Sequence, residues 1–272
     1  MRKATIKTTL KKIKMTLTKK PKIGIYGISG CAGCLLTFLY QDCFNQIREL
    51  VDIKSFPLIK EETYDGDFDY IFIEGTVCFD KDILTLNQLR KKTKYIVALG
   101  SCAHLGGVPS MKNFLNNYKT LKLVYPVYNH LKSTNPEPID KHIKVDFYLP
   151  QCPPNKDEIL EFIKQIAVGK QFKPYQESVC LEYRKKGNPC ILEKGEICLG
   201  PITRGGCDAL CPTNNTECYG CRGPTSDSNI QAFIEMLKEK GYNKKQVHEK
   251  MQTFAGLQFR DEEEKQSTWL EK

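Results

Sequence analysis

Cysteine is the residue type that most constrains what this chain can fold into. The 272 residues include 13 cysteines, an odd number that fits poorly with a complete disulfide scaffold. The start of the sequence also has no secretory apolar stretch, so we expect a reduced, cytoplasmic setting in which clustered thiols bind metal or do redox chemistry. Seven of the thiols crowd into one late segment, at Cys180, Cys190, Cys198, Cys207, Cys211, Cys218 and Cys221.

The net charge of +9 lies in the first 22 residues. They carry nine basic residues and no acidic one, which leaves 32 basic against 32 acidic residues in the remainder. We interpret residues 1–21 as a basic, disordered tail rather than a nucleic-acid-binding arm. No later stretch approaches the roughly 20 apolar residues of a membrane helix. Neither nucleic acid nor a membrane is therefore expected as a partner.

Short β-branched runs alternate with helix-like stretches over residues 22–169. Near-continuous apolar strands separated by amphipathic helices are typical of a parallel sheet with helices on both faces. We predict an α/β domain here, with a flavodoxin-like, doubly wound sheet. The predicted strands are Lys22–Ile28, Val51–Phe56, Asp69–Glu74, Tyr95–Leu99 and Val145–Leu149, and the helices are Leu35–Leu50, Lys81–Lys91 and Asn155–Ala167.

The pattern changes in residues 170–272. Up to Pro224 the sequence shows little periodicity and many Gly and Pro residues, so bound metal would have to organise it. Helices are predicted at Asn229–Lys240 and Asn243–Phe254, and the residues from Arg260 onward are expected to be exposed and mobile. We predict a smaller, irregular iron–sulfur domain with C-terminal helices.

Four cysteines directly follow predicted strands, in YGISGCAGC, VALGSCAHLGG and FYLPQCPP. The carboxyl ends of strands in an open α/β sheet line the crevice where cofactors bind. We therefore expect these thiols to converge, and four thiolates are the usual ligands of a [4Fe–4S] cluster. The alternative is that each is a small buried core residue. The four are Cys31, Cys34, Cys102 and Cys152.

The late cysteines divide into two sets. Cys207-x3-Cys211 and Cys218-x2-Cys221 give four thiols at a spacing that suits either zinc or an iron–sulfur cluster. Three cysteines remain for a further site, which is one ligand short of a complete set. They are Cys180, Cys190 and Cys198.

The motifs CAGC, GSCAHLGG and LPQCPP, followed by CLGPITRGGC and CYGC, resemble the small subunit of [NiFe] hydrogenases. The resemblance covers residues 22–224 and is greatest to the cytoplasmic branch of sulfhydrogenases and methanogen hydrogenases. It implies a proximal [4Fe–4S] cluster on the four strand-following cysteines and a medial one on Cys207, Cys211, Cys218 and Cys221. A distal site would take Cys180, Cys190 and Cys198, with Glu177 where relatives often have histidine. Gln151 stands where LPGCPP is usual.

The resemblance implies electron transfer by a hydrogenase subunit that itself lacks the Ni–Fe site. Two or three [4Fe–4S] clusters would relay electrons between a partner large subunit and a flavoprotein, ferredoxin or disulfide reductase. Two alternatives are a homologue serving another redox complex and a zinc-organised binding module.

Three further residues lie near the predicted site. Glu74 resembles a recurrent family acid near the subunit interface, where it would aid proton movement or cap backbone groups. Cys78 would either tune the proximal cluster or be structural. His104 is expected to pack rather than bind metal.

Overall fold

Five parallel strands form the central sheet of the computed structural model, which describes residues 19–62, 64–115, 117–125, 127 and 134–270. The strand order is β2-β1-β3-β4-β5, as in a flavodoxin-like sheet. The predicted α/β class is confirmed, and each predicted strand is present. The bounds are β1 Lys22–Gly27, β2 Asp52–Ser55, β3 Phe68–Glu74, β4 Thr93–Leu99 and β5 Phe147–Leu149.

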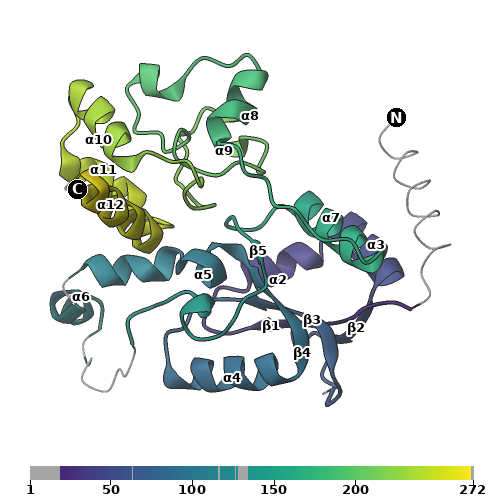
Figure 1. The fold of residues 1–272 in the computed structure, drawn as a ribbon. Helices are drawn as coiled ribbons and strands as arrows, with labels where there is room; N and C mark the ends of the chain where they lie inside the picture. The colour runs from purple at the N-terminus through teal and green to yellow at the C-terminus, as the bar shows by residue number, and fades with distance from the viewer. Residues whose placement is uncertain (1–18, 63, 116, 126, 128–133, 271–272) are drawn as a thin grey trace.

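Helices cover both faces of the sheet (Figure 1). On one face α2, α3 and α7 bury a core rich in Phe, Ile and Leu, while α4 and α5 pack on the other. This two-sided burial explains why the strands are almost continuously apolar. The helices are α2 Gly33–Phe38, α3 Gln41–Leu50, α4 Asp80–Lys91, α5 Gly100–Leu105 and α7 Lys156–Ala167.

The helix predicted at Leu35–Leu50 is wrong as a single element. It is two helices, and the break lies at Leu39–Tyr40, where Tyr40 has a non-helical backbone (φ −57°, ψ 117°). Glu74 accepts hydrogen bonds from backbone groups at the start of α2. A contact from β3 thus helps to set the position of α2, which the helical periodicity alone does not reveal.

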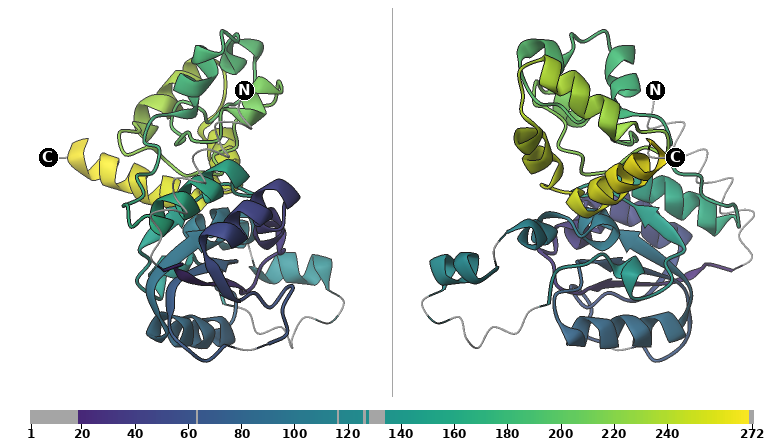
Figure 2. Two further views of the ribbon diagram at one scale, coloured as in Figure 1. Left: turned by 90° about the vertical axis from the view of Figure 1, so that its right-hand side faces the viewer. Right: turned by 60° about the vertical axis from the view of Figure 1, so that its left-hand side comes forward.

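The excursion between β4 and β5 holds short helical turns, η1 Val108–Phe114, α6 Asn117–Val124 and η2 Ile139–Lys141. Beyond β5 and α7 the chain crosses to the side of the sheet where the strands end (Figures 1 and 2). There the cysteine-rich segment, residues 170–224, is largely irregular. Its short helices are α8 Val179–Lys185, η3 Ile191–Lys194 and α9 Leu210–Thr213.

Three C-terminal helices support the cysteine-rich segment. They are α10 Ile230–Glu239, α11 Lys244–Met251 and α12 Gly256–Leu270, and they share an apolar core with Leu105 of α5 and with Leu199 and Ile202. No helix was predicted beyond Phe254, but α12 extends as far as Leu270, and the expected mobility from Arg260 onward stays a prediction. Phe259 is buried, and Gln266 binds the backbone at Ile230 and Ser228.

Residues 1–18 of the predicted tail lie outside the described part of the chain. Within the described part, no helix is both long and apolar enough to cross a membrane. The boundary predicted at residues 169–170 stays a prediction.

Phe162 on α7 offers a test of the sheet core. Its ring is fully buried, and its centroid lies between 5.1 and 6.2 Å from those of Tyr70, Phe72, Phe147 and Phe172. We expect Phe162→Ala to lower the free energy of unfolding by about 3–5 kcal/mol, through lost burial and the cavity left behind. Denaturant unfolding followed by circular dichroism measures this. Leu84→Ala, on the exposed side of α4, is the control and should change stability by about 0.5 kcal/mol or less.

Candidate metal centres

The ends of the parallel strands bring four distant cysteines together. The ladders align Gly27, Glu74, Leu99 and Leu149 in one row across β1, β3, β4 and β5. The loops that follow β1, β4 and β5 therefore leave the sheet at the same edge. They carry a group of thiols that interact electrostatically with one another, here called the sheet-edge set: Cys31, Cys34, Cys102 and Cys152.

Two glycines make room for these thiols. A Cβ on Gly100 would collide with Cys34 Sγ, and one on Gly107 would lie 2.6 Å from Cys102 Sγ. Both glycines have positive φ, +84° and +58°, which side chains other than glycine rarely adopt. The loop after β4 is thus shaped around sulfur atoms rather than around a packed apolar side chain.

Glu74 holds the loop that carries Cys31 and Cys34. It is 2% exposed, and its Oε1 accepts a hydrogen bond from Ala32 N at 2.7 Å. Its Oε2 accepts from Cys34 N at 2.9 Å and Leu35 N at 3.1 Å. Of the two roles considered for Glu74, the geometry provides backbone capping.

Burial makes three of the sheet-edge thiols, Cys34, Cys102 and Cys152, poor acids. Together with the nearby Cys152 and Cys31, burial raises the pKa of Cys102 to about 12. It also raises the pKa values of Cys34 and Cys152. Such thiols ionise near neutral pH only when a cation replaces their protons. The donor set and its glycine cradle fit a cluster of thiolate-bound iron.

The second group, here called the four-thiol set, surrounds a cavity of about 120 Å³. Apolar side chains, including Val179 and Phe254, share its lining. Burial raises the pKa of Cys221 to about 12 and that of Cys218 well above its ordinary value. Sulfur donors around an apolar-walled cavity fit an iron–sulfur cluster. The set comprises Cys207, Cys211, Cys218 and Cys221.

The third group, here called the three-thiol set, consists of Cys180, Cys190 and Cys198. Burial, with the two neighbouring thiols, raises the pKa of Cys180 to about 12. A Cβ on Gly200 would lie 3.2 Å from Cys180 Sγ and 3.4 Å from Cys198 Sγ, so this set also has a glycine beside its sulfur atoms. The side chain of Glu177 is exposed, while its carbonyl accepts from Gly205 N.

The three sets are joined by backbone hydrogen bonds to sulfur. The backbone of Cys152 hydrogen-bonds the Cys221 thiol, and Ser101 Oγ donates to the Cys221 carbonyl at 2.5 Å. On the other side, Cys218 N donates to Cys198 Sγ at 3.2 Å. The four-thiol set therefore lies between the other two.

Cys78 and His104 lie outside the three sets. The Cys78 thiol is half-buried and hydrogen-bonded to Ser29, and its backbone N–H donates to Asp82 Oδ2 at 3.0 Å. His104 is buried with its ring centroid 4.3 Å from that of Tyr148, and burial lowers its pKa to about 3, so it is neutral at pH 7. His104 thus packs, as predicted.

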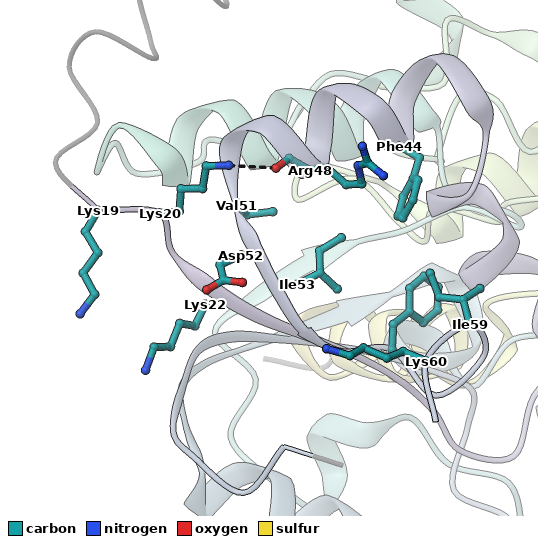
Figure 3. Close-up of a pocket in the computed structure, with 11 residues that line it drawn as sticks. Lys19, Lys20, Lys22, Phe44, Arg48, Val51, Asp52, Ile53, Ile59 and Lys60 are labelled. Carbon is teal, nitrogen blue, oxygen red and sulfur yellow. Dashed lines mark hydrogen bonds between the residues drawn. The ribbon is translucent and has the colours of Figure 1, made fainter. Parts of the chain in front are cut away.

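A separate hollow of about 740 Å³ lies at the edge strand β2 (Figure 3). Lys20 Nζ donates there to the Arg48 carbonyl at 3.1 Å. The lining combines basic and apolar residues and contains no cysteine, so this hollow belongs to none of the thiol sets.

Within the described residues, no three His, Cys, Asp or Glu side chains lie close enough together to hold a single metal ion.

Sequence reasoning missed Arg222 and its contact with Gln151. The Gln151 Oε1 atom accepts a hydrogen bond from Arg222 Nη1 at 3.3 Å. The φ of 102° at Gln151 explains why glycine is usual at this position. The signal available in the sequence was that Arg222 directly follows Cys221, a candidate ligand.

The chain is similar to several known proteins. A family described as NADH ubiquinone oxidoreductase, 20 Kd subunit, matches residues 31–166, which include the whole sheet-edge set. Sulfhydrogenase 2 subunit delta of Pyrococcus furiosus is 34% identical over 241 residues, covering 86% of this chain and 99% of that protein. An F420-non-reducing hydrogenase subunit of Methanothermobacter thermautotrophicus is 25% identical, covering 88% of this chain and 93% of that protein.

Solved structures show the same relationship. One chain of an NAD+-reducing [NiFe]-hydrogenase matches with a TM-score of 0.50 and 30% identity, over 58% of this chain and 97% of that chain. A [NiFeSe] hydrogenase chain from Dm. baculatum matches in fold, with a TM-score of 0.54 at 15% identity, over 78% and 97% of the two chains. This chain belongs to the family of [NiFe]-hydrogenase small subunits, in the branch of the sulfhydrogenases and F420-non-reducing hydrogenases.

Proposed function

We propose that this small subunit conducts electrons along its three thiol sets, between the Ni–Fe site of a large subunit and a separate electron acceptor. The observation that carries the proposal is the row of thiol sets joined by hydrogen bonds from Cys152 to Cys221 and from Cys218 to Cys198. When bound, a [4Fe–4S] cluster supplies a one-electron carrier whose potential depends on burial, charge and hydrogen bonds to sulfur.

Each thiol set is assigned by its place in the row. The sheet-edge set would hold the proximal cluster, nearest the large subunit. The four-thiol set would hold the medial one as [4Fe–4S], because Cys211 provides a fourth thiol. The three-thiol set would hold the distal cluster with Glu177, solvent or another residue as fourth ligand, or would hold an incomplete cluster.

The surrounding chain positions and insulates these thiols. Glu74 fixes the loop of Cys31 and Cys34 through its backbone contacts. Val179 and Phe254 provide apolar lining for the cavity of the four-thiol set, and Tyr183 is buried beside Cys190 and Cys198. We place the complex in the cytoplasm, with a flavoprotein, ferredoxin or disulfide reductase as acceptor.

Iron and sulfide assays on anaerobically purified protein test the proposal. We expect about twelve irons for three complete clusters, or about eight if the three-thiol set binds none. A colourless protein with zinc and no iron would instead identify the zinc-organised binding module. Co-purification with a nickel-containing chain distinguishes a hydrogenase subunit from a homologue that serves another redox complex.

Cys102→Ser tests the sheet-edge set within the assembled complex. Removal of one thiolate should disturb the proximal cluster and abolish H2-dependent dye reduction. The nickel content of the large subunit and its co-elution with this chain serve as controls and should not change. Wild-type dye reduction by the variant would contradict the ligand assignment.

Glu74→Gln tests the capping role. Replacing one acceptor oxygen by an amide should lower the free energy of unfolding by about 1–3 kcal/mol and reduce the iron held by the sheet-edge set. The control is Asn243→Ala, because Asn243 Oδ1 likewise accepts a backbone hydrogen bond, from Gln246 N at 3.0 Å, at the start of α11. The control should lose stability without losing iron. A proton-moving role for Glu74 stays a prediction, which an unchanged rate of H2–D2O exchange in Glu74→Gln would contradict.

A further inference from the structure

A fully buried arginine lies between the sheet-edge set and the four-thiol set. Arg222 directly follows Cys221, and its side chain is 1% exposed. A guanidinium withdrawn from water is costly unless its N–H groups and its charge are satisfied. The partners of Arg222 therefore indicate what keeps it there.

Those partners come from three separate segments. Glu158 on α7 forms a bidentate salt bridge with Arg222, in which the Nη1–Oε2 and Nη2–Oε1 distances are both 2.8 Å. Nη1 also donates to the Pro150 carbonyl at 3.4 Å and to Gln151 Oε1 at 3.3 Å, in the turn just before Cys152. Nε donates to the Gly205 carbonyl at 2.5 Å, two residues before Cys207.

The guanidinium also lies beside the four-thiol set. Arg222 lines the same cavity as Cys207, Cys211, Cys218 and Cys221, so its positive charge lies next to these thiols. Glu158, 11% exposed, provides the balancing negative charge from α7. Arg204 contributes a second positive charge close to Arg222. The four-thiol set therefore faces the positive end of a buried ion pair.

We propose that the Arg222–Glu158 pair sets the reduction potential of the cluster in the four-thiol set relative to the cluster in the sheet-edge set. Arg222 is a positioning residue that also raises this potential, and Glu158 limits the effect. This inference rests on the proposed function, because it requires that Cys207, Cys211, Cys218 and Cys221 hold a cluster.

The sign follows from charge. Reduction adds an electron, so a nearby cation stabilises the reduced cluster and a nearby carboxylate destabilises it. Arg222→Gln removes the cation and leaves Glu158, which should lower the potential of the medial cluster. Glu158→Gln leaves Arg222 uncompensated and should raise it. The double variant removes both charges and should return the potential toward the wild-type value, even though it has lost the hydrogen bonds.

Redox titration of the assembled complex, followed by electron paramagnetic resonance, measures these shifts. We expect each single variant to change the equilibrium constant for reduction of the medial cluster at least tenfold, which is about 59 mV for one electron, in opposite directions. Arg222→Lys keeps the charge, so it should shift the potential by less than half as much as Arg222→Gln. The midpoint temperature of thermal unfolding of Arg222→Lys should still fall, because an ammonium group cannot reproduce the bidentate salt bridge to Glu158.

Arg90→Gln is the matched control. Arg90 Nη1 pairs with Asp146 at 2.7 Å and donates to the Lys144 carbonyl, and Nη2 donates to carbonyls at the start of β4, the end of the strand opposite to Cys102. This variant removes the same charge and a comparable pair, but it should leave the medial potential unchanged.

Shifts of the same sign in Arg222→Gln and Glu158→Gln, or a medial potential that does not move in either, would overturn the inference. If Arg222→Gln does not assemble, Arg222→Lys and Glu158→Gln still provide the comparison. Iron and sulfide contents separate the two proposals. If the four-thiol set of the wild-type protein holds no iron, the proposed function is contradicted. If the iron content is full but the medial potential does not change in the variants, only the role of the ion pair is contradicted.

Discussion

The register of the parallel sheet is the constraint on which the other features depend. Gly27, Glu74, Leu99 and Leu149 lie in one row, so the loops that follow β1, β4 and β5 leave the sheet together. A slip of two residues in one ladder would displace a thiol by about 7 Å. Burial of both faces of the sheet opposes such a slip, because it would pull large apolar side chains out of their places. The apolar core thus holds the thiols in place.

The cysteine-rich segment depends on a different balance. It has few regular elements, and burial raises the pKa values of Cys180 and Cys221. Thiolate–metal bonds would add to its small apolar cluster, which includes Val179, Tyr183 and Ile191, and would replace the protons that burial retains on the thiols. The hydrogen bond from the Cys152 backbone to the Cys221 sulfur and the Arg222–Glu158 pair attach this segment to the sheet edge. The same contacts that join the two parts of the chain lie along the proposed path of electrons.

Much of the fold follows from local pattern, and the errors have identifiable causes. The strands and α7 were predictable because burial on two faces leaves continuous apolar runs and burial on one face leaves a helical stripe. The split at Tyr40 was not, because part of what sets α2 is Glu74, a residue of another strand. Helix α12 was missed because it is stabilised by burial of Phe259 in a core built from distant helices. Arg222 was overlooked because sequence does not reveal whether a charged side chain is buried.

By itself, the sequence determined the α/β class, the three groups of cysteines and the family. These depend on residue type, spacing and periodicity, which act over short stretches of chain. The tertiary structure alone revealed the contacts that join the thiol sets, the capping role of Glu74 and the place of Arg222 between two of the sets. Those features depend on hydrogen bonds and charges that meet across segments far apart in the chain, and strand register and helix packing bring those segments together.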